Sequence, residues 1–393
     1  MNCPKCQQPI ESTHNYCHAC GYTLPSDDSS GNRSSKSGEK HGHQPWYRRP
    51  KSVRLAGQIT ASVLSGAVGA MIALLLAFYV FAPENGPLFG RRSNVVVVTA
   101  APFEERSSLG RINASSLLSF HDSTFLVIDD LTDDAFYELK FFADGRKAEP
   151  LQRHAISGLK PRMVEDFEGS TAVEVNGRKY FLAVSSLEKD EGENTENGFV
   201  RIAVGQDGGL TGDVMPGFRS WLVANNPAIG QLAEGPDSLD VQGLAWDPVR
   251  NVVLLGVRSA TSSRQPVVLA LRVKDWNGPW TIDNLESSEA ISLAVATAEK
   301  PKGIYSLVRH PSRPVFYAVV RDSDGRSGAA ELYVWDGGAS GTVKLIPDLV
   351  FHPAMRPEGL AFGTIGDRPA LVIVDDNGGY SVLWVDELPF LAS

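Results

Sequence analysis

Three kinds of hydrophobic and polar patterning divide the chain. Residues 1–55 show no apolar periodicity, and residues 56–82 contain no charged side chain. From residue 93 onward, short β-rich runs alternate apolar and polar positions and are separated by turns of Gly, Asp, Asn and Pro. Alternation with a period of two is typical of β-strands. The pattern predicts a small polar N-terminal region, one apolar segment and a large β domain.

One hairpin pattern recurs five times in the β domain. Each copy has a strand, a polar turn and a very apolar second strand, and the copies begin at Ser115, Asp166, Asp240, Lys302 and Arg356. A propeller blade takes about 40–50 residues. We therefore predict a mainly β fold, a β-propeller of about six blades over residues 93–393, with five blades as the alternative. A β-sandwich would not repeat so regularly. The run at 93–102 is expected to close the ring on the last blade, and residues 218–226 are the best helix candidate.

The uncharged segment 56–82 has the length of a membrane span. Its last twenty residues contain one polar side chain, Ser65, and an α-helix needs about 20 residues to cross a bilayer. A signal peptide would lie nearer the N-terminus. The basic residues ahead of the segment predict a single-pass protein of the cytoplasmic membrane, with the N-terminus inside and the large domain periplasmic or extracellular. Small residues at Ser62, Gly66 and Ala70 would let two such helices pack as a homodimer.

All four cysteines lie at the start of the chain and form two C-x-x-C pairs: Cys3, Cys6, Cys17 and Cys20. Two such turns make a tetrahedral thiolate site, which Zn²⁺ prefers; two redox dithiols are the alternative. In its CPKC and CHACG motifs, the segment 1–23 resembles the zinc-ribbon domains of many bacterial membrane proteins. The resemblance implies one structural zinc ion. Residues 24–55 are expected to form a flexible basic linker, and residues 83–92 a juxtamembrane spacer.

Composition and charge narrow the function further. The 393 residues are 42% hydrophobic and 21% charged, with a net charge of -9. Residues 1–55 hold eight Lys or Arg against four acids, so the remainder carries -13. This charge argues against nucleic acid as a partner. The sequence contains neither a G-x-S-x-G elbow nor a phosphate-binding loop. His121, His310 and His352 fall in turns, where we expect structural roles.

Antiparallel pairing should bring the start and the end of each hairpin to one rim of the ring. The candidate rim residues are Asp129, Asp130, Glu168, Arg258, Lys302, Arg321, Glu358, Asp375 and Asp376. The carboxylates fall on three contiguous blades and the cations on the other two. Such a rim would hold Ca²⁺ or Mg²⁺ on its acidic side and phosphate on its basic side. The alternative is that these residues pair with one another as solvated salt bridges.

The hairpins VQGLAWDPVRNVVLLGVRSA and RPEGLAF resemble a bacterial propeller family of unknown function that is related to the esterase-like phytases. The resemblance covers about residues 115–390, and Gln242 and Lys302 depart from the Glu of its pattern. We expect a membrane-anchored binding or scaffold protein, with an envelope ligand or partner outside and a cytosolic protein partner for the ribbon. The alternative function is an extracytoplasmic, metal-assisted phosphoesterase.

Overall fold

Strands dominate the part of the chain that the structure describes. The computed structural model describes residues 95–104, 112–160, 163–188, 198–259, 261–295, 300–325, 329–388 and 391. Among these residues, no helix combines the length and the apolar character needed to cross a bilayer. The four cysteines, the linker and the predicted span all lie outside the described residues, so the zinc and membrane assignments stay predictions.

The described strands include five units of four strands each, which we call blades 1 to 5; blades 1 and 2 together form one eight-stranded sheet. Blade 1 contains β3 (Ala114–His121), β4 (Thr124–Asp129), β5 (Ala135–Lys140) and β6 (Gln152–Ser157). Blade 2 contains β7 (Phe167–Val175), β8 (Arg178–Ser185), β9 (Phe199–Val204) and β10 (Leu210–Met215). Blade 3 contains β11 (Val241–Asp247), β12 (Val252–Val257), β13 (Val267–Val273) and β14 (Leu285–Ser292). Blade 4 contains β15 (Lys302–Arg309), β16 (Phe316–Asp322), β17 (Glu331–Trp335) and β18 (Val343–Leu345). Blade 5 contains β20 (Pro357–Ile365), β21 (Arg368–Asp375), β22 (Gly379–Trp384) and the N-terminal β2 (Ala101–Pro102).

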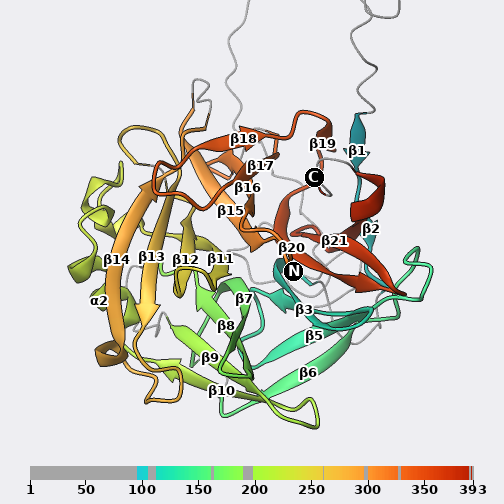
Figure 1. Cartoon of the computed structure of the whole chain (residues 1–393), viewed down its shortest axis with the longest axis horizontal. Coiled ribbons are helices and arrows are strands. Elements are labelled where there is room, and N and C mark those ends of the chain that lie inside the picture. The colour runs from blue at the N-terminus through green and yellow to red at the C-terminus, as the bar shows by residue number, and fades with distance from the viewer. Residues whose placement is uncertain are drawn as a thin grey trace, which may run out of the picture. The chain divides into compact units, whose positions relative to one another are not determined.

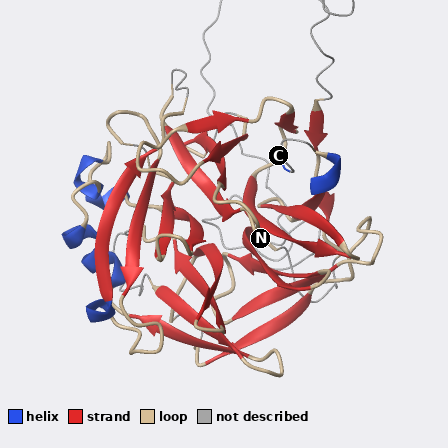
Figure 2. Ribbon diagram, in the orientation of Figure 1, coloured by secondary structure: helices blue, strands red, loops and turns tan. Residues whose placement is uncertain are grey.

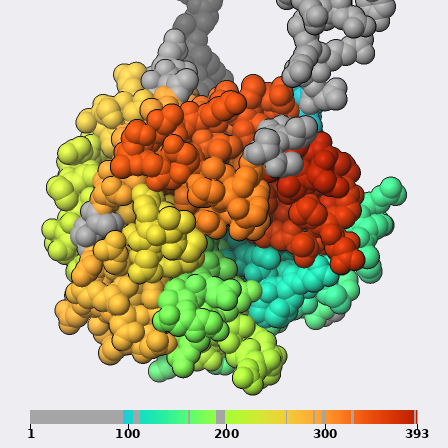
Figure 3. All heavy atoms as spheres, in the orientation of Figure 1, coloured from blue at the N-terminus to red at the C-terminus, as the bar shows by residue number. Residues whose placement is uncertain are grey.

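The blades are arranged in a closed ring. The innermost strands contact one another in the order β3, β7, β11, β15, β20 and back to β3. In the view down the short axis these strands gather around the centre and the outer strands lie at the periphery (Figure 1). In the space-filling view the blades follow one another around the face in chain order (Figure 3). This ring is a β-propeller, and the β-sandwich alternative is wrong.

Two short N-terminal strands tie the start of the domain to its end. β2 pairs antiparallel with β22 of blade 5, as predicted for the run at 93–102. β1 (Val96–Val98) pairs in parallel with β19 (Leu349–Phe351). Blades 1 and 2 are joined in addition by parallel pairing of their outer strands, β6 and β10.

The helices of the described region lie at the edge of the ring (Figure 2). They are α2 (Phe218–Asn225) and the short 3₁₀ helices η1 (Ile229–Gln231), η2 (Pro236–Ser238), η3 (Ile282–Asn284) and η4 (Val385–Glu387). α2 confirms the helix expected at residues 218–226. The segment between β10 and β11 carries α2, η1 and η2 and adds no blade strand.

The second strand of each hairpin contains a continuous apolar run because both of its faces are covered by neighbouring blades. In β4, Phe125 and Val127 pack in the cluster shared with blade 5, whereas Leu126 and Ile128 pack in the cluster shared with blade 2. Five such clusters fill the five blade interfaces of the described region. Burial of apolar area at about 25 cal/mol per Å² makes these interfaces the main source of stability.

The blade count is five in the described residues, rather than about six. Dividing the domain length by a typical blade length gave too many blades for two reasons. The helical segment between β10 and β11 belongs to no blade, and the N-terminal run contributes only the closing strand β2. The five hairpins marked in the sequence are the inner halves of the five blades.

Candidate functional site

A β-bulge near the start of the innermost strand marks one rim of the ring, which we call the mouth. In blades 1, 2, 3 and 5 the residue skipped by the pairing register is Ser115, Glu168, Gln242 and Glu358, respectively. A bulge re-aims a side chain that regular pairing would place within the sheet. In blade 4 the irregularity falls later, at Tyr305. The recurring E-G and Q-G pairs of the sequence therefore encode the bulges.

A glycine close to the bulge in blades 2 to 5 allows the innermost strands to approach closely near the axis. A Cβ on Gly359 would lie 2.7 Å from the backbone carbon of Ser116 on β3. A Cβ on Gly303 would lie 2.0 Å from the carbonyl oxygen of Arg258. Real Cβ atoms do not make such contacts with backbone, so these glycines are required by the packing of the ring.

Carboxyl groups of blades 1, 2 and 5 converge on the mouth. Burial raises the pKa of Glu168 well above its usual value, and the charges of Glu358 and Asp166 add to this shift. Burial likewise raises the pKa of Glu358 to about 8, with a further contribution from Asp376. The pKa of Asp130 rises to about 7 through burial and the neighbouring Asp129, Asp166 and Asp376. These groups therefore form one electrostatic cluster, and several of them hold protons near neutral pH.

The cations predicted for the rim are already bound by carboxylates. Arg258 Nε contacts Asp240 Oδ2, and its NH2 lies 3.1 Å from Glu188 Oε1. Burial raises the pKa of Asp240 to about 7 against the effect of Arg258. Because a guanidinium keeps its proton, we treat this contact as an ion pair.

The other two cations of the rim are bound in the same way. Arg321 NH1 lies 3.4 Å from Glu358 Oε1, and its guanidinium stacks 4.4 Å from the ring centre of Tyr305. Lys302 Nζ lies 3.1 Å from Asp322 and 3.5 Å from Glu331, both in blade 4. Lys302 is thus tied to its own blade, whereas the two arginines border the acidic cluster. The salt-bridge alternative describes these cations: the Arg321–Glu358 and Lys302–Asp322 pairs are largely buried, whereas the Arg258–Glu188 pair is partly exposed.

Two of the predicted rim carboxylates hold the backbone. Asp129 Oδ1 accepts the backbone N–H of Asn113 at 2.9 Å, and Oδ2 accepts the hydroxyl of Thr132 at 2.7 Å. Asp375 accepts the backbone N–H groups of Arg356 at 3.1 Å and Asn377 at 2.7 Å. Both aspartates end the second strand of their blade and anchor the chain that enters the first. Their role in the described structure is to shape the mouth.

Three acceptor atoms of the mouth are buried without a hydrogen-bond donor among the described residues. They are Asn113 Oδ1, Asp130 Oδ1 and Glu168 Oε2. Glu168 is only 8% exposed. Bulk water therefore has little access to its carboxyl oxygens and does not readily supply the missing hydrogen bond. Burying a polar group without a partner costs about 1–3 kcal/mol. Buried polar atoms without partners that recur in one region of a protein are typical of a binding site.

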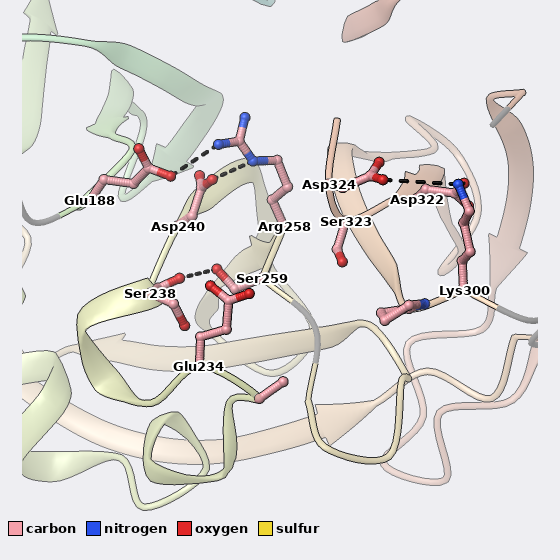
Figure 4. A pocket seen from close by; sticks show the side chains of 12 residues that line it. Glu188, Glu234, Ser238, Asp240, Arg258, Ser259, Lys300, Asp322, Ser323 and Asp324 are labelled. Atoms are coloured by element: carbon pink, nitrogen blue, oxygen red, sulfur yellow. Dashed lines mark hydrogen bonds and ion pairs between the residues drawn. The ribbon is translucent and has the colours of Figure 1, made fainter. Parts of the chain in front are cut away.

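A polar cavity of about 500 Å³ adjoins the mouth beside blades 3 and 4. Figure 4 shows Glu188 and Asp240 turned toward Arg258 on one side of this cavity. Lys300, Asp322 and Asp324 lie on the other side. Asp240 and Arg258 belong both to the cavity wall and to the electrostatic surroundings of Glu168. The cavity therefore shares two wall residues with the surroundings of Glu168.

The described residues do not supply a compact metal centre. No group of three His, Cys, Asp or Glu side chains in the described ranges is placed to hold one metal ion, and Ca²⁺ takes six to eight oxygen ligands. The mouth carboxyls are thus close enough to shift one another's pKa without converging on a single point. Ca²⁺ or Mg²⁺ at the rim stays a prediction from the sequence.

The three histidines singled out in the sequence lie in or beside turns. The ring of His310 accepts the backbone N–H of Ser312 at Nδ1, 3.2 Å away, and its Nε2 lies 3.2 Å from the carbonyl oxygen of Leu391. His352 Nδ1 accepts the backbone N–H of Ala354 at 3.2 Å. His121 is the last residue of β3, where its ring lies 3.8 Å from that of Phe120.

Sequence reasoning missed several residues of the mouth: Asn113, Asp166, Glu188, Asp240 and Tyr305. Asp166 and Asp240 stand two positions before the bulge residue in D-F-E-G and D-V-Q-G, so the repeat itself carried a signal for them. Tyr305 carried none, because its place in the mouth depends on the shifted bulge of blade 4. Asn113 and Glu188 lie in connecting segments outside the strands.

No protein-family model matches the chain, and no curated protein matches it significantly. The allergen Mala s 1 of Malassezia sympodialis is similar over 70% of this chain and 92% of its own, at 9% identity and a TM-score of 0.41. A GH43_1 enzyme from Xanthomonas citri is similar over 74% and 92%, at 11% identity and a TM-score of 0.40. The Cps50 (Swd1) β-propeller domain of Myceliophteria thermophila is similar over 66% of each chain, at 11% identity and a TM-score of 0.28. With TM-scores below 0.5, these similarities carry no argument about the fold or the chemistry of this chain, and the resemblance to the phytase-related family stays a prediction.

Proposed function

We propose that this protein is a membrane-anchored binding protein whose propeller mouth takes up a small polar ligand. The observation that carries the proposal is Glu168, a carboxyl that is 8% exposed and has an oxygen without a donor. Its pKa is raised by burial and by Glu358, Asp166 and Asp240 around it. A bound ligand that donates hydrogen bonds would remove this deficit.

The anchoring part of the proposal is supported by the sequence pattern alone. The uncharged segment 56–82 would hold the chain in the cytoplasmic membrane, with the propeller outside. The cysteine pairs of residues 1–23 would fold a zinc ribbon in the cytosol, where thiols stay reduced. A ribbon with four cysteine ligands is closed to substrate, so we assign it a protein partner rather than a reaction.

A ligand screen with matched variants tests the proposal. The full-length protein in detergent is heated with neutral polyols, anions and amines, and the unfolding temperature is compared between the wild type, Glu168→Gln and Glu174→Gln. Glu174 lies on the same strand as Glu168 and is exposed, so its variant controls for the lost charge. A ligand at 100 times its Kd stabilises the fold by about 2.7 kcal/mol. We expect at least one class of compound to stabilise the wild type and Glu174→Gln but not Glu168→Gln. If no compound gives a Glu168-dependent shift, the mouth is not the binding site.

Phosphoester hydrolysis is the other function considered for the mouth, and the ion pairs of the predicted cations speak against it. The charges of Arg258, Arg321 and Lys302 are already offset in part by carboxylates, which weakens their attraction for phosphate. Hydrolysis of phosphoesters in the presence of Ca²⁺ or Mg²⁺ that is lost in Glu168→Gln would replace the binding proposal by this second function.

A further inference from the structure

The mouth carries more carboxyl groups than basic groups. In the part of the chain that the structure describes, its carboxyls are Asp130, Asp166, Glu168, Asp240, Glu358 and Asp376. The basic groups that border them are Arg258, Arg321 and Arg356, and the guanidinium groups of the first two lie 6.0 and 4.4 Å from the ring centre of Tyr305. Each of these arginines already contacts a carboxylate. Among the described residues, Asp130 and Glu168 form no ion pair with a basic side chain.

The buried polar atoms of the mouth that have no hydrogen-bond partner all lack a donor. Asn113 Oδ1, Asp130 Oδ1 and Glu168 Oε2 are acceptors, and no buried donor of the mouth is left without a partner among the described residues. An ammonium group offers three N–H donors, accepts none and carries a positive charge. It is therefore complementary to the mouth both in hydrogen bonding and in charge.

We propose that the ligand of the mouth is a small organic cation with primary ammonium groups, held on the side of blades 1, 2 and 5 by Glu168, Asp130 and Glu358. This inference rests on the proposed function and narrows its ligand class. The net charge of -13 over residues 56–393 adds an attractive field for cations at long range.

Other ligand classes fit the mouth less well. A bare divalent ion needs several oxygens within about 2.6 Å of one point, and no described group of three acidic or histidine side chains provides this. A neutral polyol would donate hydrogen bonds but leave the acidic excess uncompensated. An anion would meet arginines that are already paired with Asp240, Glu358 and Asp376.

Binding of such a cation is coupled to the release of protons. Burial and mutual repulsion keep Glu168 and Glu358 partly protonated, because their pKa values are raised. A positive group beside a carboxyl lowers its pKa. An ammonium group that enters the mouth therefore displaces protons from this pair, and calorimetry in buffers of different ionisation enthalpy counts them.

The experiment is isothermal titration of the full-length protein in detergent at pH 7.0. The probes are 1,4-diaminobutane and ethanolamine, with xylitol as a neutral probe and inorganic phosphate as an anionic one. We expect the amines to bind with proton release and the other two probes not to bind. Glu168→Gln is expected to weaken amine binding at least about tenfold, as the loss of one charge-assisted hydrogen bond predicts. Gln242 occupies the equivalent bulge of blade 3, so glutamine is compatible with the fold at this position. Glu174→Gln is the control and should bind as the wild type does.

The outcomes separate this inference from the proposed function. If xylitol or phosphate binds in a Glu168-dependent manner and the amines do not, the cation inference is wrong and the binding function stands. If the amines bind equally to the wild type and Glu168→Gln, the mouth is not their site and the inference is also wrong. If no probe binds here and the wider screen gives no Glu168-dependent shift, the binding function fails as well.

Discussion

The buried carboxyl of Glu358 makes a specific prediction about stability and pH. Burial and Asp376 raise its pKa to about 8, from 4.5 for a free glutamate. The folded state therefore binds this proton more tightly than the unfolded state does. Between about pH 4.5 and pH 8 the group is protonated when folded and ionised when unfolded, so the free energy of unfolding falls as the pH rises through this window. Below pH 4.5 both states are protonated and the penalty is absent.

The size of the effect follows from the pKa difference. One pKa unit corresponds to about 1.36 kcal/mol, so a shift of roughly 3.5 units sets an upper limit of about 5 kcal/mol. Glu358→Gln keeps the shape of the side chain and cannot ionise. Relative to the wild type, this variant should gain stability by a few kcal/mol from pH 5 to pH 9. Removing the charge of Glu358 also lowers the pKa of Glu168, which adds to the gain in the same direction.

Thermal unfolding of the full-length protein in detergent, followed by tryptophan fluorescence between pH 5 and pH 9, measures this difference. Trp335 is fully buried and reports on the folded state. Glu174→Gln removes an exposed carboxyl of the same kind and should show no such dependence on pH. A difference between Glu358→Gln and the wild type that is the same at pH 5 and pH 9 would refute the reasoning, because it would mean that Glu358 is ionised throughout.

Three further predictions test the ring, the mouth and the N-terminal segment. Gly359→Ala should destabilise the propeller by about 1–3 kcal/mol, because its Cβ would overlap the backbone of β3; Gly230→Ala, which meets no atom within 4 Å, should be close to neutral in the same unfolding assay. Asp375→Ala should cost about 1–3 kcal/mol, because it leaves two backbone N–H groups without an acceptor; unchanged stability would contradict the anchoring role. The purified full-length chain should contain about one zinc ion by elemental analysis, and Cys17→Ser with Cys20→Ser should remove it; wild-type protein free of zinc would show that the ribbon assignment is wrong.

The hairpins could be predicted from the sequence because their second strands are packed between two blades. Runs such as TFLVID in β4 and VVLLGV in β12 are buried at every position, and such runs stand out in any hydrophobicity pattern. The outer strands give a weaker signal. β6 has one buried residue of six, and β18 has none. The number of blades had to be taken from the domain length, which the helical segment after β10 makes misleading.

For the rim residues, the sequence could predict only the end of the blade at which each one lies, because strand direction determines that end. Antiparallel pairing correctly placed Asp130, Glu168 and Glu358 at the same end of their blades. It could not show that Asp129 and Asp375 turn to the backbone, since this depends on local hydrogen bonds. The position of a bulge is set by how neighbouring strands pack, and for this reason Tyr305 rather than Lys302 reaches the mouth from blade 4.

The other blades of the same chain show that the acidic residues of the mouth are not needed for the fold. At the bulge of blade 1, Ser115 donates to the carbonyl oxygen of Phe167 at 2.6 Å. At the bulge of blade 3, Gln242 donates to Asp240 at 3.0 Å. Neutral side chains therefore satisfy this position within the ring, at no electrostatic cost. Glu168 and Glu358 occupy the same position with buried carboxyls that repel each other, which lowers stability. Buried carboxyls at two bulges, where neutral side chains serve at two others, are explained if Glu168 and Glu358 bind a ligand that Ser115 and Gln242 do not contact.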